Sequence, residues 1–124
     1  MRRLLVVLAC LALFSVAAKP APSGTIALAP GSDARLGGTV NFVVTTSHLP
    51  GNANPRVQVL CYQDAALVYG EAYNVGTAFL LGGGWSLWLE RGGPADCHAD
   101  LYYWDFHPSQ VFNWLAGTDF AASG

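Results

Sequence analysis

Short runs of alternating hydrophobic and polar residues, separated by turn-forming residues, extend over the chain after residue 24. Glycine, proline and asparagine punctuate these runs, and no helical period is present. This spacing predicts an antiparallel sandwich or barrel. Strands are expected at residues 25–29, 39–46, 56–63, 66–69, 77–81, 85–90, 95–104 and 112–121.

The alternation also assigns each residue of a strand to one of two faces, since successive side chains point to opposite sides. The apolar faces carry Val40, Phe42 and Val44 in the second run, Val57, Val59 and Cys61 in the third, and Cys97, Ala99, Leu101 and Tyr103 in the run at 95–104. Both cysteines therefore lie on apolar faces. A shift of one residue in either strand would have placed one of them outside.

The first 18 residues have the features of a signal peptide. Arg2 and Arg3 precede an apolar stretch, and the small residues at 16–18 supply a cleavage site, so that Lys19 becomes the new N-terminus. Residues 19–24, with the sequence KPAPSG, are expected to form a flexible tether ahead of a domain at 25–124.

Two other interpretations of this segment are less favoured. A membrane anchor would need about 20 apolar residues, more than the run provides. A lipoprotein attached through Cys10 would leave an apolar segment of about six residues, below the range of roughly 7–15 in signal peptides. We therefore expect a secreted, extracellular protein.

The mature chain has about 106 residues, the size of one domain. Without Arg2 and Arg3, four basic residues remain against eight acidic ones, so the net charge is about −4. This balance disfavours nucleic acid and anionic membranes as partners, because both require clustered basic residues. Although the hydrophobic content of 52% includes the signal peptide, enough large apolar residues remain for a core.

Cys61 and Cys97 are the cysteines of the mature chain, and in an exported domain they are expected to form one disulfide. An alternative is that Cys97 and His98 act as a nucleophile and its base. Neighbouring side chains in a strand point to opposite faces, so His98 cannot easily reach the sulfur. We therefore expect no catalytic site.

A metal site is a further alternative, because His98 and Asp100 share a face of their expected strand. Zinc sites need three or four ligands, and His48 and His107 fall in expected loops. A solvated polar pair is favoured, with no metal.

The chain also has no Gly-x-Ser-x-Gly or His-Glu-x-x-His motif, and the glycines at 82–84 are expected to form a turn or bulge between strands rather than a phosphate site. No cofactor is expected.

Three sequence segments resemble those of a known class of proteins. Residues 37–42 read GGTVNF, residues 94–103 read PADCHADLYY and residues 114–120 read WLAGTDF. With about seven strands in roughly 100 residues, the chain resembles the immunoglobulin-like sandwich, and more narrowly the small secreted immunoglobulin-like proteins of actinobacteria and their phages. The resemblance covers nearly the whole mature chain. It implies the fold, but little about function because this group is mostly uncharacterised.

The chain differs from antibody domains in the position of its cysteines. Antibody domains join their second and sixth strands across the two sheets, over a tryptophan of the third strand, whereas the second run here has no cysteine and the third has no tryptophan. The resemblance implies that the strands carrying Cys61 and Cys97 are neighbours in one sheet, so that the disulfide is a cross-strand link. Closing a loop of about 37 residues would stabilise the fold by roughly 4 kcal/mol in the chain-entropy model. Antibody-type recognition does not carry over.

If these two strands pair, their outer face carries more apolar area than a solvated sheet face usually does. The residues on this candidate binding face are Leu60, Tyr62, His98, Tyr102 and Trp104. Such patches tend to mark interaction sites, and aromatic rings suit protein partners and stacked ligands alike. The alternative is that the C-terminal tail or the loop at 105–112 covers the face.

The sequence therefore predicts a non-enzymatic binding or adhesion module that contacts an unknown extracellular protein or glycan through this face. One alternative is a structural or decoration subunit that self-associates, or adds an edge strand, on a cell or phage surface. A small secreted enzyme is the least favoured alternative, since it requires a free Cys97 thiol. The ligand, the oligomeric state and the biological process are left open.

Overall fold

The computed structural model describes residues 19–84, 86–106 and 110–124. These residues form an all-β structure with several antiparallel sheets and one short helix, which confirms the prediction of an all-β, antiparallel fold. The strands are β1 (Ser23–Leu28), β2 (Thr39–Val40), β3 (Phe42–Ser47), β4 (Pro55–Gln63), β5 (Ala66–Asn74), β6 (Phe79–Leu80), β7 (Ala95–Asp105) and β8 (Val111–Ala122), and the helix is α2 (Leu87–Arg91).

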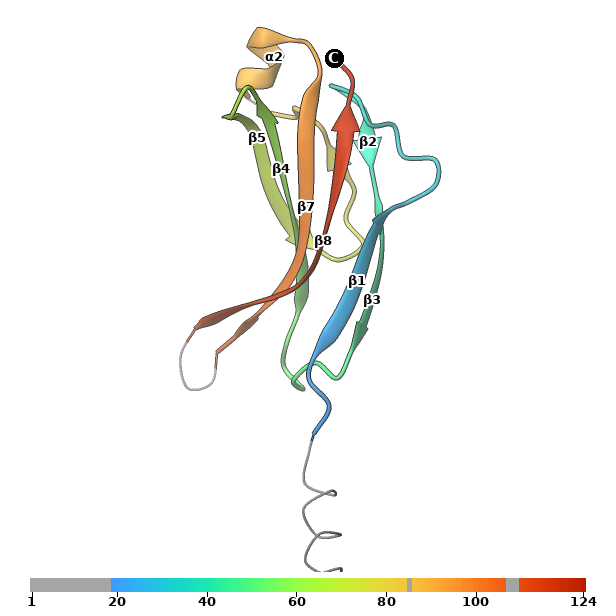
Figure 1. Cartoon of the computed structure of the whole chain (residues 1–124), viewed down its shortest axis with the longest axis vertical. Helices are drawn as coiled ribbons and strands as arrows, with labels where there is room; N and C mark the ends of the chain where they lie inside the picture. Colours follow the sequence, from blue (N-terminus) through green and yellow to red (C-terminus); the bar gives the residue numbers. More distant parts are fainter. Residues whose placement is uncertain (1–18, 85, 107–109) are drawn as a thin grey trace, which may run out of the picture.

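The largest sheet has four antiparallel strands in the order β5-β4-β7-β8. Two smaller sheets, β1-β3 and β2-β6, pack beside it, and β1 runs along β8 (Figure 1). The pairing of β7 with β8 continues past the last residue pair of β4, and this end of the hairpin bends away from the rest of the molecule (Figure 1).

The core lies between the four-stranded sheet and the smaller sheets. The predicted alternation in β4 is present, because Val57, Val59 and Cys61 are buried while Tyr62 is exposed. In β7 the inward residues are likewise buried, as predicted. The remaining core side chains include Ile26, Val40, Val68, Tyr69, Phe79, Leu81 and Trp88.

A disulfide joins Cys61 of β4 to Cys97 of β7, as the sequence predicted. The two residues lie directly opposite each other in the register of the two strands, with Cα atoms 4.0 Å apart. The bond is therefore a link between neighbouring strands of one sheet. Both cysteines are buried, so the sulfur atoms belong to the core.

The prediction of a strand at residues 85–90 is wrong, because residues 87–91 form helix α2. Ser86 caps the helix by accepting a hydrogen bond from the N–H of Leu89, and Gly92 ends it with φ +63°. Trp88 is fully buried while Leu87 and Leu89 are exposed. One helical turn that buries a single residue has the same exposed-buried-exposed pattern as a strand, and this caused the error.

Other boundaries also differ from the predictions. The single strand expected at 39–46 is broken at Asn41, whose N–H donates to Ser32 Oγ and whose carbonyl accepts from Ala29. The residues before the break pair with β6 and those after it pair with β1. The glycines at 82–84 do form a turn, but a helix follows them rather than a strand.

The N-terminal predictions can be compared with the structure only in part. The expected signal peptide at 1–18 lies outside the described residues, as do Trp85 and His107. The tether expected at 19–24 is shorter, because β1 already begins at Ser23 opposite Ser47. Among the described residues no helix has the length and apolar character needed to span a bilayer.

Candidate functional site

The outer face of the four-stranded sheet collects the residues that the sequence singled out. In the register of β4 and β7, Leu60 lies opposite His98, Tyr62 opposite Asp96, and Tyr102 opposite Arg56. The five predicted residues Leu60, Tyr62, His98, Tyr102 and Trp104 therefore share this face. Their role in binding stays a prediction.

Strand β8 adds residues to this face that the sequence analysis missed. A register shift between Leu101 and Tyr102 leaves Leu115 without a partner across the pair, so the alternation of β8 changes face at this point. Trp114 consequently shares the outer face with Asp119, although an unbroken alternation would separate them. The only signal in the sequence is the aromatic content of the strand, which does not reveal the bulge.

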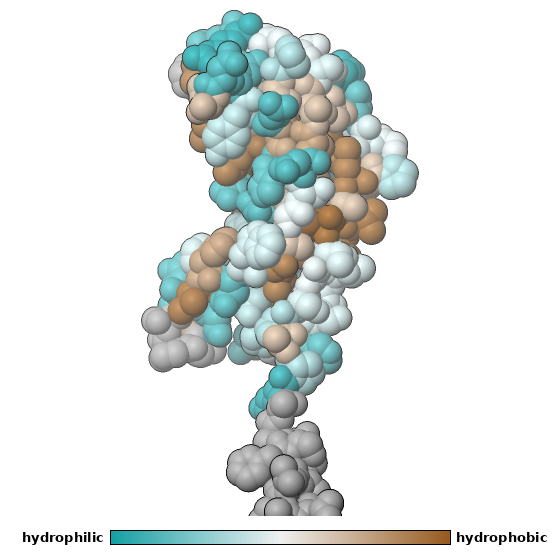
Figure 2. Space-filling model, in the orientation of Figure 1, coloured by the Kyte–Doolittle hydropathy of each residue, from teal (hydrophilic) through white to brown (hydrophobic). Residues whose placement is uncertain are grey.

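Three rings pack together at the hairpin end of the face. Tyr102 lies 4.9 Å from Phe112 and 6.2 Å from Trp104, and Trp104 lies 5.4 Å from Phe112, between ring centroids. Tyr102 is buried beneath its neighbours and is 6% exposed, whereas Phe112 and Trp114 are 48% and 59% exposed. We call Tyr102, Trp104, Phe112 and Trp114 the aromatic face. In Figure 2 hydrophobic and hydrophilic surface lie side by side on this hairpin, above its grey tip.

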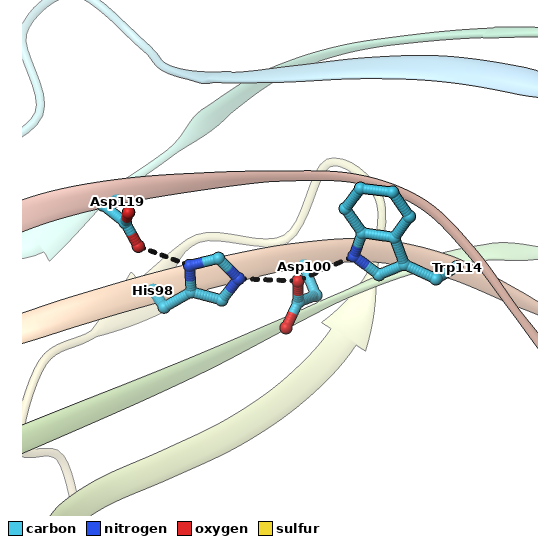
Figure 3. A network of polar contacts seen from close by, with 4 residues as sticks. All are labelled: His98, Asp100, Trp114 and Asp119. Atoms are coloured by element: carbon cyan, nitrogen blue, oxygen red, sulfur yellow. Dashed lines mark hydrogen bonds and ion pairs between the residues drawn. The ribbon is translucent and has the colours of Figure 1, made fainter.

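Both ring nitrogens of His98 contact carboxylates on the same outer face (Figure 3). Nδ1 lies 2.5 Å from Asp119 Oδ1, and Nε2 lies 2.7 Å from Asp100 Oδ1. A neutral imidazole has one N–H, so the imidazolium form is the one that donates to both carboxylates. The hydrogen bond to Asp119 is the largest cause of a raised His98 pKa; the hydrogen bond to Asp100 adds to it, while partial burial opposes it.

Asp100 connects this pair of contacts to the aromatic face. Its Oδ1 atom also accepts a hydrogen bond of 2.9 Å from the indole N–H of Trp114 (Figure 3). The orientation of the most exposed ring of the aromatic face is therefore linked to the charged group. We call His98, Asp100 and Asp119 the histidine cluster.

Gly117 makes room for the histidine cluster. It pairs with Asp100 in the register of β7 and β8, and a Cβ atom built on it would lie 3.0 Å from Asp100 Oδ1 and 3.0 Å from His98 Cε1. Such contacts are tighter than ordinary van der Waals distances. The absence of a side chain here lets the imidazole lie over β8.

The surroundings of His98 and Cys97 bear on the two alternatives of a metal site and a cysteine nucleophile. The ring nitrogens of His98 face carboxylates, and no group of three or more ligating side chains suited to a metal occurs in the part of the chain that the structure describes. Cys97 is bonded to Cys61 and points into the core, on the opposite face from His98. In this state its sulfur is not a thiolate, the form that acts as a nucleophile.

Hollows border both ends of the outer face. At the disulfide end, Tyr62 lies between two hollows of about 520 and 530 Å³, the second of which is also lined by Asp96, His98 and Asp119. At the hairpin end, two hollows of about 340 and 300 Å³ lie against Trp104. The disulfide end is thus acidic, while the hairpin end is aromatic.

Comparisons with known proteins found no matching family model, no matching curated protein and no matching solved structure.

Proposed function

We propose that this chain is a secreted, non-enzymatic binding or adhesion module with an immunoglobulin-like sandwich, which contacts an extracellular protein or glycan through the aromatic face. The observation that carries the proposal is the exposure of Phe112 and Trp114 on a sheet face whose neighbouring rings are packed in place. Exposed large aromatic residues that are held rigidly contribute strongly to binding because little side-chain entropy is lost.

The strand arrangement supports the immunoglobulin-like part of the proposal. Immunoglobulin variable domains have strands C″, C′, C, F and G in one sheet and strands A, B, E and D in the other. The order β5-β4-β7-β8 resembles strands C′, C, F and G, while β1, the broken strand β2–β3 and β6 resemble A, B and E. None of the described strands corresponds to C″ or D. A parallel bridge between Arg35 and Ser123, at the end of β8, is consistent with the same topology.

The disulfide supports the secreted part of the proposal. Disulfides form and persist in oxidising compartments and are rare in the cytosol. A buried Cys61–Cys97 bond is compatible with an extracellular protein, and the charged and apolar pattern of residues 1–18 provides a route for export.

The test is a binding screen of the secreted chain against arrays of extracellular proteins and of glycans, repeated with Trp114→Ala and Phe112→Ala. We expect each variant to weaken binding to the captured partner by at least about tenfold, as for residues at the centre of an interface. Leu89→Ala is the matched control, because Leu89 is 54% exposed but lies on α2. A partner whose affinity is unchanged in both aromatic variants would contradict the proposal. Tyr102→Ala is unsuitable here, since Tyr102 is buried.

One observation favours the alternative of a self-associating structural subunit. Among the described strands β5 pairs with β4 alone, so the backbone of its other edge has no strand partner. Edge-to-edge addition of a second copy at β5 predicts a sedimentation coefficient that rises with protein concentration. A coefficient that stays at the monomer value would exclude this alternative without affecting the binding proposal.

A further inference from the structure

We propose that the groove between the turn at residues 50–54 and the β7–β8 hairpin binds an uncharged oligosaccharide. The inference rests on the proposed binding function and names the class of ligand, and it places that ligand at the edge of the aromatic face, because Tyr102 and Trp104 line the groove. Two hollows of about 340 and 300 Å³ share Asn52, Trp104 and Phe106, so they form one continuous groove. Its remaining lining residues are Pro50, Gly51, Ala53, Asn54, Arg56, Tyr102 and Asp105.

One wall of the groove is aromatic and held in place. The Trp104 ring packs edge-on against both Tyr102 and Phe112, with interplanar angles of 89° and 71°. Aromatic faces carry partial negative charge and attract the weakly positive C–H groups that cover one face of a sugar ring. Because neighbouring rings hold Trp104, stacking a sugar on it costs little side-chain entropy.

The opposite wall supplies amide groups that suit hydroxyl groups. Asn52 is exposed and makes no hydrogen bond to any residue in the described ranges, so its donor and acceptor atoms are both free for a ligand. The Asn54 amide donates to Asn74 Oδ1 at 3.2 Å, which leaves its own carbonyl oxygen as an acceptor. A sugar hydroxyl both donates and accepts, and side-chain amides match this property.

The charges of the groove favour an uncharged ligand. Arg56 contributes one positive charge and Asp105 one negative charge, so their charges cancel. The Arg56 guanidinium also donates to Asn74 Oδ1 and to the carbonyl of Ala72, at 3.1 Å each, which restrains its position. An anionic ligand such as a phosphate or an acidic sugar would meet no excess of positive charge among the described lining residues.

The size of the groove favours a sugar over a protein surface. Hollows of about 300–1,000 Å³ suit small ring-containing ligands, and both hollows lie at the lower end of this range. A stable protein interface buries about 800 Å² on each partner, which requires a broad surface rather than a narrow groove. A protein partner is therefore an outcome that the test must distinguish.

The experiment measures binding of the full secreted chain to immobilised neutral oligosaccharides of hexoses and N-acetylhexosamines. Acidic oligosaccharides and an array of extracellular proteins are measured in parallel. Asn52→Ala is the main variant, because this exposed side chain makes no hydrogen bond to the residues that the structure describes. We expect at least one neutral oligosaccharide to bind, and Asn52→Ala to weaken it by about tenfold, as for a lost hydrogen-bonded group.

Asn41→Ala is the matched control, since Asn41 is exposed, lies outside the groove and forms hydrogen bonds with the described residues through its backbone only. Its affinity for the same oligosaccharide should equal that of the unmodified protein. A second measurement follows the side-chain amide resonances of Asn52 by NMR, and these should shift as the oligosaccharide is titrated in.

Several outcomes would overturn the inference. One is that the protein binds extracellular proteins but no oligosaccharide, with an affinity that Trp114→Ala weakens. That outcome would support the proposed function and contradict the assignment of an oligosaccharide as the ligand. Binding of acidic oligosaccharides alone would contradict the charge argument, and neutral binding that Asn52→Ala does not change would place the site elsewhere. If neither oligosaccharides nor proteins bind, the inference and the proposed function both fail.

Discussion

The two ends of the outer sheet face differ in how far their side chains satisfy one another. At the disulfide end, the charged groups of the histidine cluster contact each other, and Asp100 and Asp119 each accept from His98. At the hairpin end, Phe112 and Trp114 expose about half of their surface and Asn52 has no hydrogen-bond partner among the described residues. Polar side chains that already form hydrogen bonds with one another need no ligand to complete their hydrogen bonding. The hairpin end is therefore where a partner is expected.

Trp114 joins the two ends, because its ring belongs to the aromatic face while its N–H donates to Asp100. A change in the position of Asp100 can consequently alter the orientation of the Trp114 ring. The following variants test how separate the two ends are.

The largest effect is expected from removing the disulfide. Cys61→Ala combined with Cys97→Ala should lower the free energy of unfolding by roughly 4 kcal/mol, because the unfolded chain regains the freedom of a loop of about 37 residues. Urea denaturation measures the loss. Binding by the hairpin end should persist wherever the variant remains folded, because its rings pack on one another. A loss of binding in the folded variant would show that the two ends are not separate.

The two tyrosines of the face should differ in their contribution to stability. Tyr102→Ala should lower the free energy of unfolding by about 3 kcal/mol, as for a buried aromatic side chain, since Tyr102 is buried against Trp104 and Phe112. Tyr62→Ala should cost less than about 1 kcal/mol, because Tyr62 is 37% exposed. Chemical denaturation of both variants compares them directly, and equal losses would contradict the difference in burial between the two side chains.

A smaller effect is expected at Gly117. Gly117→Ala would place a methyl group 3.0 Å from both Asp100 Oδ1 and His98 Cε1, so the contact between these two side chains must loosen. We expect a loss of about 1 kcal/mol of stability and a lower His98 pKa, which NMR titration of the imidazole measures. Gly51→Ala is the control, because a Cβ there meets no atom within 4 Å. An unchanged His98 pKa in Gly117→Ala would show that the contact does not depend on this space.

The smallest effect is the pH dependence of stability due to His98. Its pKa is raised in the folded protein, chiefly by the hydrogen bond to Asp119 and further by Asp100, above the ordinary value of 6.5. The folded state therefore binds the proton more tightly than the unfolded state does. This contribution to stability is fully present below about pH 6.5 and is lost as the pH rises through the folded pKa.

Unfolding of the unmodified protein and of His98→Gln at several pH values measures this contribution. The stability difference between the two should shrink as the pH rises above 6.5, and Asp119→Asn should weaken the dependence. His48→Asn is the control, since asparagine tolerates the left-handed backbone of His48 at φ +59°. A difference that grows with pH would contradict a raised His98 pKa.

Local sequence patterns were sufficient for much of the fold. Alternation in β4 and β7 placed Val57, Val59 and Leu101 inside and Tyr62 outside, because a strand with one apolar face has few other stable arrangements. The disulfide between Cys61 and Cys97 could be predicted because the chain after residue 18 has two cysteines and both lie on the apolar faces of their strands. The helix at Trp88 could not be distinguished from a strand, because one buried residue between two exposed ones fits both periods.

The composition of the outer face was only partly determined by the sequence. Alternation brought Leu60, Tyr62, His98, Tyr102 and Trp104 to one face without any knowledge of contacts, because it depends on neighbouring residues alone. The tertiary structure decided that Trp114 and Asp119 join them, since the bulge at Leu115 changes the face of β8. It also decided that Asn52 approaches Trp104 from a distant turn. Strand register and the approach of distant segments depend on packing over the whole domain, which no local pattern contains.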